Sequence, residues 1–266
     1  SDPAWDLSPG PGGGGAVPPS FHRNLPQVLP KVQSLSTSGK PRDILGRTVK
    51  MKEEIAGRIR QLGIIPVVVI DRAEYALDLG EALVRGGLPC AEITFRTEAA
   101  AESIQRLSRE LPEILLGAGT VLSEDQARRA QDAGALFIVS PGLNMQVVDF
   151  CRDQGIAIFP GVCTPTEIDA ARNRGLKVVK FFPAEPIGGL TYLKAIAAPY
   201  SDISYIPTGG IGLSQLAEYL AFSKVLACGG SWLVRKEWLA SGQFDRVTQA
   251  AAEAVRLVKE TRGASE

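Results

Sequence analysis

The chain has 266 residues, of which 45% are hydrophobic and 22% are charged, a composition typical of globular proteins and not of disordered or fibrous ones. Lysine plus arginine and aspartate plus glutamate each number 29, so the chain lacks the basic surplus of a protein that neutralises nucleic-acid phosphates. It also lacks an apolar run of the roughly 20 residues that a membrane span needs. We therefore predict small-molecule partners, with no nucleic acid and no membrane.

The residues that most often carry catalysis are scarce. The one histidine, His22, lies outside the patterned part of the chain, which disfavours a Ser-His-Asp triad, a histidine base and a His-ligated metal. The four cysteines have no CxxC spacing and are predicted to be buried thiols in a reducing, cytoplasmic compartment. They are Cys90, Cys151, Cys163 and Cys228.

Residues 1–50 differ from the rest of the chain. They hold 7 glycines and 8 prolines and show no sustained period of 2 or 3.6, so no core is predicted there. The first methionine is Met51, where periodic sequence begins. We predict a disordered or irregular N-terminal extension over 1–50, a linker or a segment introduced by cloning. A targeting segment is the alternative, since 20–40 is rich in serine and free of acids.

From residue 52 to the end, short apolar runs alternate with amphipathic stretches. The runs have the length and the Val, Ile and Phe content of buried strands. They cover 64–70, 90–95, 114–118, 136–139, 156–159, 178–181, 203–206 and 225–228. Helical patterns fill the intervals, among them 73–85, 99–110, 124–132 and 145–154, and several stop at a glycine.

Eight strands that are apolar throughout, each followed by a helix, indicate a parallel sheet covered by helices. Their near-even spacing favours closure into a (β/α)₈ TIM barrel over 52–266, preceded by an N-terminal helix. A doubly wound nucleotide-binding sheet is the competing fold. That fold typically has a GxGxxG motif after the first strand, whereas this chain has Asp71-Arg72-Ala73-Glu74 there.

In such a barrel the active site lies at the carboxyl ends of the strands. The second strand ends with Glu92, Thr94 and Arg96, which strand alternation places on one face. If that face points inward, an acid and a guanidinium converge on the barrel mouth. The alternative is a buried Glu–Arg pair that only stabilises the barrel.

The sixth strand carries Lys180 between apolar neighbours. An amine held there is costly to keep as an ammonium ion, so its neutral form becomes accessible and can attack a carbonyl to form a Schiff base. If the strand faces the other way, Lys180 instead packs its stem against a helix.

Glycine pairs follow the seventh and eighth strands, Gly209-Gly210 after Thr208 and Gly229-Gly230 before Ser231. These are the two loops where barrels of this class bind phosphate, because glycine lets backbone N–H groups approach the anion. Tight turns without a ligand are the alternative. Thr120, after the third strand, could hydrogen-bond a substrate anion.

Taken together, these motifs closely resemble the family of 2-keto-3-deoxy-6-phosphogluconate (KDPG) aldolases, which often also cleave 4-hydroxy-2-oxoglutarate (KHG). The resemblance runs in order from about residue 52 to the end. It rests on 91–98 (AEITFRTE), 117–122 (GAGTVL), 140–143 (SPGL), 180–185 (KFFPAE), 207–211 (PTGGI) and 229–234 (GGSWLV).

The resemblance implies a role for each of these positions. Lys180 would form the Schiff base and Glu92 would be the general acid and base. The substrate-binding residues would be Arg96, Thr120, Pro141 and Thr208, and the phosphate-binding residues Gly209, Gly210, Gly230 and Ser231. It also implies a homotrimer that needs no metal and no cofactor. Pro186-Ile187 departs from the smaller or polar residues that relatives commonly carry there, which we expect to affect specificity and not the reaction type.

The expected activity is cleavage of KDPG to pyruvate and glyceraldehyde 3-phosphate by a class I, Schiff-base aldolase. Three alternatives stay open at this point. One is an aldolase for KHG or another pyruvate-derived substrate, and another is a phosphate-binding barrel isomerase that uses paired acids. The third is an assembly scaffold built on the aldolase trimer.

Overall fold

The computed structural model describes the chain from residue 41 to residue 263, with side chains from residue 49. Most of the predicted extension, including His22, lies outside these residues. The described part begins with helix α1 (Pro41–Leu62), so helical structure starts ten residues before Met51. The preceding N-terminal helix of the prediction is therefore present and is longer than the periodic sequence indicated.

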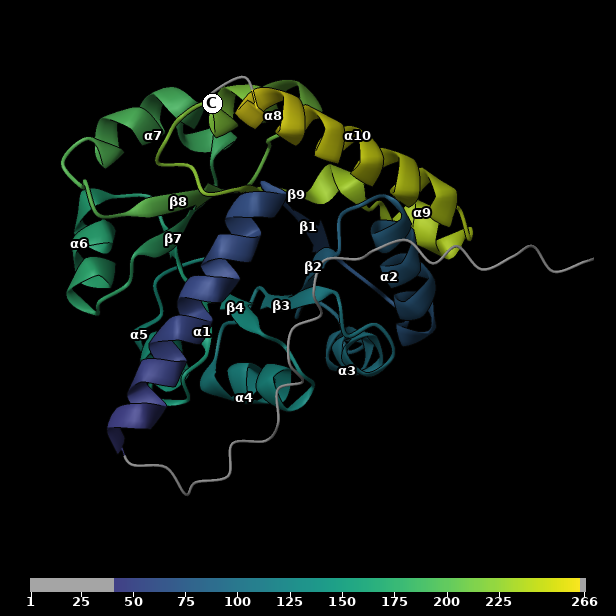
Figure 1. The fold of residues 1–266 in the computed structure, drawn as a ribbon, viewed down its shortest axis with the longest axis horizontal. Helices are drawn as coiled ribbons and strands as arrows, with labels where there is room; N and C mark the ends of the chain where they lie inside the picture. Colours follow the sequence, from purple (N-terminus) through teal and green to yellow (C-terminus); the bar gives the residue numbers. More distant parts are fainter. Residues whose placement is uncertain (1–40, 264–266) are drawn as a thin grey trace, which may run out of the picture. The chain divides into compact units, whose positions relative to one another are not determined.

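An alternation of strand and helix follows α1 (Figure 1). The strands are β1 (Ile64–Val68), β2 (Cys90–Thr94), β3 (Leu115–Gly119), β4 (Phe137–Val139), β5 (Ala157–Phe159), β6 (Gly161–Val162), β7 (Val178–Phe181), β8 (Ser204–Pro207) and β9 (Cys228–Gly230). The α-helices are α2 (Ala76–Arg85), α3 (Ala100–Glu110), α4 (Glu124–Asp132), α5 (Met145–Asp153), α6 (Pro165–Asn173), α7 (Gly189–Ala197), α8 (Leu213–Leu220), α9 (Lys236–Ala240) and α10 (Phe244–Gly263). Short 3₁₀ helices are η1 (Ala73–Tyr75), η2 (Glu185–Ile187) and η3 (Ser231–Leu233).

All recorded strand pairs are parallel, as the uniformly apolar strands predict. The strands form one sheet in the order β5-β4-β3-β2-β1-β9 and a second in the order β6-β7-β8. Isolated bridges connect the β8 region to the β9 region. One joins Tyr205 of β8 to Val225, which precedes β9, and the other joins Thr208, just after β8, to Gly229 of β9. The fold is thus α/β with a parallel sheet, and all strands point their carboxyl ends the same way.

Two strands differ in more than their exact ends from the sequence prediction, whereas each of the others ends within two residues of its predicted limits. The expected strand 156–159 is shorter and is followed after Pro160 by β6, because proline has no N–H to donate to a ladder. The expected strand 225–228 contributes only Cys228 to β9, which runs on through Gly229 and Gly230. Glycines within a strand carry no apolar signal, so the pattern placed this strand too early.

Two clusters of buried side chains lie on the two faces of the strands. The larger one joins alternate strand residues, such as Ile93 and Val179, to the surrounding helices. The smaller one consists of the opposite strand residues, among them Ile65, Phe137 and Ile206. Helix α1 contributes Ile55 and Ile59 to the smaller cluster, so this helix packs on the face that the outer helices leave uncovered.

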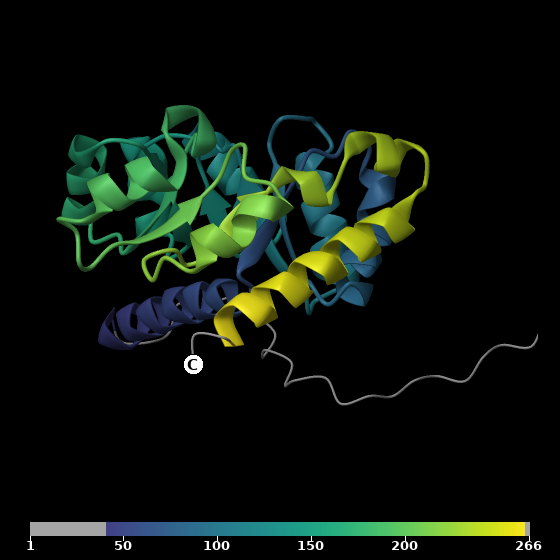
Figure 2. The ribbon, with the colours of Figure 1, turned by 90° about the horizontal axis from the view of Figure 1, so that it is seen from above.

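Side-chain caps fix the starts of three consecutive outer helices, α4, α5 and α6. Ser123 accepts a hydrogen bond from the Gln126 N–H before α4, and Asn144 accepts one from the Gln146 N–H before α5. At α6, Thr164 and Glu167 cap each other reciprocally. Helix α10 packs along α2 and α8 and so connects the beginning and the end of the repeat (Figures 1 and 2).

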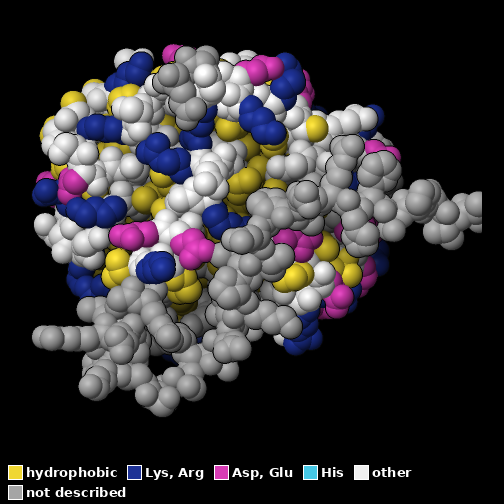
Figure 3. Space-filling view, in the orientation of Figure 1, with side chains coloured by type: hydrophobic (Ala, Val, Ile, Leu, Met, Phe, Trp, Pro, Cys, Tyr) yellow, Lys and Arg dark blue, Asp and Glu magenta, His cyan; other side chains and the backbone are white. Residues whose placement is uncertain are grey.

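The surface carries charges of both signs. Lys and Arg side chains are interspersed with Asp and Glu on the face seen in Figure 3, as the zero net charge leads one to expect. Within residues 41–263, none of the helices has both the length and the apolar character that crossing a membrane requires.

Candidate active site

The predicted site residues come from several strands and meet at one edge because every strand is parallel. Glu92 lies in β2 and Lys180 in β7, while Thr120 directly follows β3 and Pro141 closely follows β4. The glycine-rich segments follow β8 and end β9. This is the carboxyl edge of the sheet, where enzymes of this architecture bind their substrates.

Lys180 and Glu92 form the centre of the site. The Lys180 Nζ lies 3.8 Å from the Glu92 Oε1, although the two residues belong to different sheets. Lys180 is 5% exposed and Glu92 is 2% exposed. The prediction that Lys180 faces the same interior space as Glu92 agrees with this contact. The alternative in which Lys180 packs outward against a helix does not.

The carboxyl group of Glu92 has few partners other than Lys180. Among the described residues its Oε1 is buried without a hydrogen-bond partner. Burial raises the pKa of Glu92, and the neighbouring Lys180 ammonium opposes that rise without cancelling it. A carboxyl group with a raised pKa can both donate and accept a proton near neutral pH, which is what a general acid and base must do.

Glycines create the space that this carboxyl group occupies. A Cβ atom on Gly119 of β3 would collide with the Glu92 carboxyl oxygen, and one on Gly117 would collide with the Phe137 ring. On β6, a Cβ on Gly161 would collide with the Pro141 carbonyl. Bare backbone therefore lines part of the interior and leaves room for functional groups.

Phe182 forms one side of the lysine's surroundings, a role that the sequence analysis did not assign. Its ring centroid lies 5.0 Å from the Lys180 Nζ. An aromatic face attracts an ammonium ion and also excludes water from it. The sequence could have indicated this role, because Phe182 comes two residues after Lys180 and strand alternation places both side chains on the same face.

Arg96 lies beyond the strand that was expected to carry it. Strand β2 ends at Thr94, whose hydroxyl donates to the Val68 carbonyl at 2.8 Å, and Arg96 lies exposed in the following turn. Strand alternation therefore holds for Glu92 and Thr94 and stops before Arg96. Within the described part of the chain its guanidinium forms no ion pair or hydrogen bond, so no Glu92–Arg96 structural pair exists there.

Thr120 has the one positive φ among non-glycine residues in the described part of the chain, at 55°. A threonine rarely adopts this left-handed conformation, because its branched side chain crowds the backbone, and such strain is concentrated at functional sites. It follows Gly119 directly and is partly exposed at the edge of the sheet. The conformation marks the turn that the sequence analysis selected for anion binding.

The glycine segments after β8 and β9 lie next to each other. Thr208 is bridged to Gly229, and a Cβ on Gly229 would collide with the Thr208 hydroxyl. Gly209 and Gly210 have φ of 103° and 84°, a conformation that favours glycine. Gly230 is buried and Ser231 is exposed at the start of η3. The structure thus brings both predicted loops to one place.

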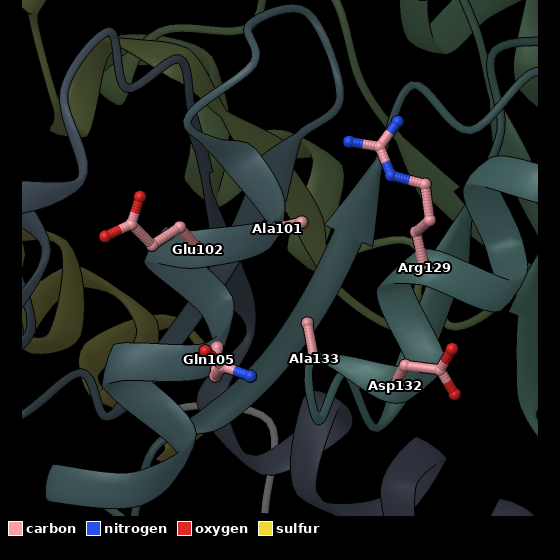
Figure 4. Close-up of a pocket in the computed structure, with 6 residues that line it drawn as sticks. All are labelled: Ala101, Glu102, Gln105, Arg129, Asp132 and Ala133. Atoms are coloured by element: carbon pink, nitrogen blue, oxygen red, sulfur yellow. The ribbon is translucent and has the colours of Figure 1, made fainter.

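A buried serine lies near the carboxyl edge of the sheet, and a surface groove lies away from it. Ser140, just before Pro141, has a buried hydroxyl without a hydrogen-bond partner among the described residues. A groove of about 330 Å³ lies between α3 and α4 (Figure 4). It is lined by Ala101, Glu102, Gln105, Arg129, Asp132 and Ala133, none of which is a predicted site residue. The predicted catalytic residues, Lys180 and Glu92, therefore do not belong to this groove.

A buried lysine beside a buried carboxyl group, at the carboxyl edge of a parallel α/β sheet, defines an enzyme that works through an amine nucleophile and a proton-transfer group. The family model described as aldolase, KDPG and KHG aldolase, matches residues 55–250. The chain belongs to this family, which decides against the isomerase alternative.

Relatives and solved structures agree with this assignment. The 2-dehydro-3-deoxy-phosphogluconate aldolase of Treponema pallidum is 48% identical over 200 residues, covering 75% of this chain and 95% of the relative. The KHG/KDPG aldolase of Escherichia coli is 42% identical over 196 residues, covering 74% and 92%. The KDPG aldolase of Legionella pneumophila, with pyruvate captured as a covalent carbinolamine intermediate, is 34% identical with a TM-score of 0.72, covering 75% and 97%.

The raised pKa of Glu92 predicts a pH-dependent cost to stability. Because the folded pKa lies above the value of about 4.3 in an unfolded chain, the native state loses stability as pH rises through the folded pKa. Glu92→Gln lacks this ionisation. We therefore expect the free energy of unfolding of the unmodified enzyme to fall relative to Glu92→Gln as the pH rises above about 4, by at most about 1.4 kcal/mol per pH unit.

Urea denaturation at a series of pH values measures this difference. Glu218→Gln is the matched control, since Glu218 is exposed on α8. Plots of unfolding free energy against pH for this variant and for the unmodified enzyme should run parallel. An unmodified enzyme that gains stability over Glu92→Gln as pH rises would show that attraction to Lys180 outweighs the burial of the carboxylate.

Proposed function

We propose that this chain cleaves KDPG to pyruvate and glyceraldehyde 3-phosphate through a Schiff base on Lys180. The observation that carries the proposal is the buried Lys180 amine, 3.8 Å from the Glu92 carboxyl at the carboxyl edge of the sheet. Family membership supports the reaction class. No step requires a metal or a cofactor, since the amine itself supplies the electron sink.

The first half of the reaction forms the iminium ion. The neutral Lys180 amine attacks the C2 ketone of the substrate, and the resulting carbinolamine loses water as Glu92 donates a proton to the departing hydroxyl. A positive iminium nitrogen then withdraws electrons from the C3–C4 bond. Glu92, now a carboxylate, accepts the C4 hydroxyl proton while that bond breaks and glyceraldehyde 3-phosphate leaves. Proton transfer of this kind contributes about 10²–10⁴ in rate.

The second half returns the enzyme to its starting state. The enamine of pyruvate is protonated at C3 by Glu92 and becomes an iminium ion again. Water then adds to C2, and the lysine amine leaves with release of pyruvate. The proximity of one carboxyl group to the lysine nitrogen allows it to serve every proton transfer, through a water where the distance requires one.

We assign the substrate carboxylate to Arg96 and Thr120. Arg96 is exposed after β2 with an unengaged guanidinium in the described residues, and a planar guanidinium can bind two carboxylate oxygens at once. The strained Thr120 backbone presents its hydroxyl at the end of the adjacent strand β3. Pro141, next to Gly161, would border the pyruvate end of the site.

We assign the phosphate end to Gly209, Gly210, Gly230 and Ser231, and we keep Thr208 beside them as a substrate-binding residue. Their support is that the loops after β8 and β9 lie together and expose backbone that a side chain would otherwise cover. Cleavage of KHG, which has no phosphate, is the alternative or second activity. It would use Lys180 and Glu92 in the same way and depend little on Ser231.

We further propose that the parallel sheet closes into a (β/α)₈ barrel. Strands β5 and β6 would be two halves of one strand interrupted at Pro160, and the Tyr205–Val225 and Thr208–Gly229 bridges support contact between β8 and β9. With those two joints, the neighbours run in a ring from β1 through β9. The 3.8 Å contact between Lys180 and Glu92, which belong to separate sheets, fits a shared interior.

We also propose a homotrimer in the cytoplasm. Leu122, next to the site edge, has a large apolar side chain that is 55% exposed, and contact with a neighbouring copy would bury it. All four cysteines are free, which suits a reducing compartment. Sedimentation equilibrium should give three times the chain mass, and Leu122→Asp should reduce it. A protein that sediments as a monomer at micromolar concentration would contradict the trimer.

The Schiff base is tested by reduction with borohydride in the presence of pyruvate. We expect a stable adduct on Lys180, found by mass spectrometry of the digested protein, because only an imine is trapped in this way. Lys180→Ala should give no adduct and lose aldol cleavage while the circular dichroism spectrum stays unchanged. Lys177→Ala is the matched control, since Lys177 is exposed and pairs with Asp202. Turnover retained by Lys180→Ala would refute the Schiff-base mechanism.

The assigned roles of Glu92 and Arg96 predict different kinetic losses. Glu92→Gln keeps the size of the side chain but cannot carry a proton, so kcat should fall by about 10²–10⁴ while some pyruvate is still trapped. Arg96→Ala removes the carboxylate anchor, so it should chiefly raise KM for substrate and for pyruvate. Steady-state kinetics of both variants measure this. A similar loss of kcat in both, with KM unchanged, would contradict the assignment.

A further inference from the structure

The segment after the lysine strand is attached to the backbone of the phosphate loop. The Ala184 N–H donates to the Thr208 carbonyl at 2.8 Å, and the Glu185 N–H donates to the Gly209 carbonyl at 3.0 Å. These two bonds lie beyond the ends of β7 and β8, in a register that differs from the regular pairing of the two strands. The start of η2 therefore forms one wall of the loop that we assign to phosphate.

The loop itself has little to hold its shape. Gly209 and Gly210 are consecutive residues with positive φ, and they carry no side chains that could pack. What packs against them comes from elsewhere. Gly209 lies against Phe182, and a Cβ on Gly210 would stand 2.7 Å from the Glu185 Cβ and 3.0 Å from its Cγ. The stem of Glu185 thus occupies the space beside Gly210.

The carboxylate of Glu185 is held in turn by Tyr219. The Tyr219 hydroxyl donates to the Glu185 Oε1 at 2.5 Å, and a Cβ on Gly189 would lie 3.0 Å from the same oxygen. Tyr219 is 1% exposed on α8, the helix that directly follows the glycine loop. Burial, and then the bond to Glu185, raises the pKa of Tyr219, so the hydroxyl keeps its proton throughout the working pH range.

We propose that Glu185 and Tyr219 are a positioning pair that fixes the Gly209–Gly210 loop and thereby sets the preference for a phosphorylated aldehyde half. The inference rests on the proposed function, because it concerns the phosphate end of that site. The pair contacts the loop and not the reacting atoms. Its loss should therefore weaken the binding of phosphate without altering the chemistry at Lys180.

Glu185 positions the loop through its hydrogen bond with Tyr219 and through its packed side-chain stem, and not through its negative charge. A carboxylate near a phosphate site repels the anion, so it cannot contribute binding energy by itself. A glutamine keeps the stem and an oxygen that accepts from Tyr219. Glu185→Gln should therefore behave like the unmodified enzyme, whereas Glu185→Ala removes both the stem and the acceptor. Tyr219→Phe removes a single oxygen and leaves the packing of α8 in place.

The experiment compares KDPG with KHG as substrates for each variant. For Tyr219→Phe and Glu185→Ala we expect KM for KDPG to rise about tenfold, as for a lost hydrogen bond to a charged group, with kcat nearly unchanged. Cleavage of KHG should change less than about twofold, since KHG has no phosphate to misplace. Inorganic phosphate as a competitive inhibitor of KHG cleavage should likewise bind about tenfold more weakly.

Tyr192→Phe is the matched control. The Tyr192 hydroxyl donates to the Cys163 carbonyl at 2.9 Å, so this variant also loses a tyrosine hydrogen bond, here to a neutral backbone group away from the glycine loop. It should keep the KDPG to KHG ratio of the unmodified enzyme. Equal losses on both substrates, or an unchanged ratio in Tyr219→Phe and Glu185→Ala, would overturn the role of the pair.

Borohydride trapping of pyruvate separates this failure from a failure of the proposed function. If all variants trap pyruvate normally and the substrate ratio does not move, the aldolase assignment stands and the positioning pair is wrong. If the unmodified enzyme traps no pyruvate, the proposed function fails, and the pair fails with it.

Discussion

The contact between Lys180 and Glu92 is the constraint on which the rest of the site depends. An amine and a carboxyl group are kept 3.8 Å apart where almost no water reaches them, and burial disfavours the charged form of the Glu92 carboxyl group. Among the described residues, the Glu92 Oε1 has no hydrogen-bond partner, unlike the oxygens of a purely stabilising ion pair. The arrangement of the two groups leaves hydrogen-bonding positions free for a substrate. The surrounding fold must therefore supply the stability that this pair does not.

The fold meets that requirement by dividing the strands into two faces. One face packs against the outer helices in a large apolar cluster, and the other packs against α1 in a smaller one. On this second face, Gly117 and Gly119 replace the bulk that a core strand would normally carry. The polar groups thus occupy space that glycine has vacated, so the apolar packing on the far face of the same strands is undisturbed.

Residues within strands were easier to predict from sequence than residues in the turns that follow. Glu92 and Lys180 were found because strand alternation and apolar neighbours fix their direction, and both lie in strands as expected. Arg96 was assigned to the same face as Glu92, yet alternation ends at Thr94, where the chain turns. The two-residue period still places Phe182, one residue beyond β7, but it fails for Arg96, two residues beyond β2.

Contacts between distant segments left even weaker signals. Tyr219 lies on an amphipathic helix and looks like any core residue, and only the folded chain brings its hydroxyl to Glu185. The break at Pro160 could be recognised from proline chemistry, whereas the shift of β9 toward Gly229 and Gly230 could not, because glycine mimics a loop. Side-chain chemistry located the reacting groups, and tertiary structure was needed to see what holds them.

Helix α1 has a consequence for how the chain is synthesised. Ile55 and Ile59 belong to the cluster that contains Ile206, Leu226 and Ala227, residues that are translated near the end of the chain. A ribosome therefore releases the helix long before the last strands that cover it exist. Until then its apolar side chains are open to solvent or to a chaperone, and the cluster is completed only at the final stage of translation. The cluster that α1 completes thus joins an early and a late segment of the chain.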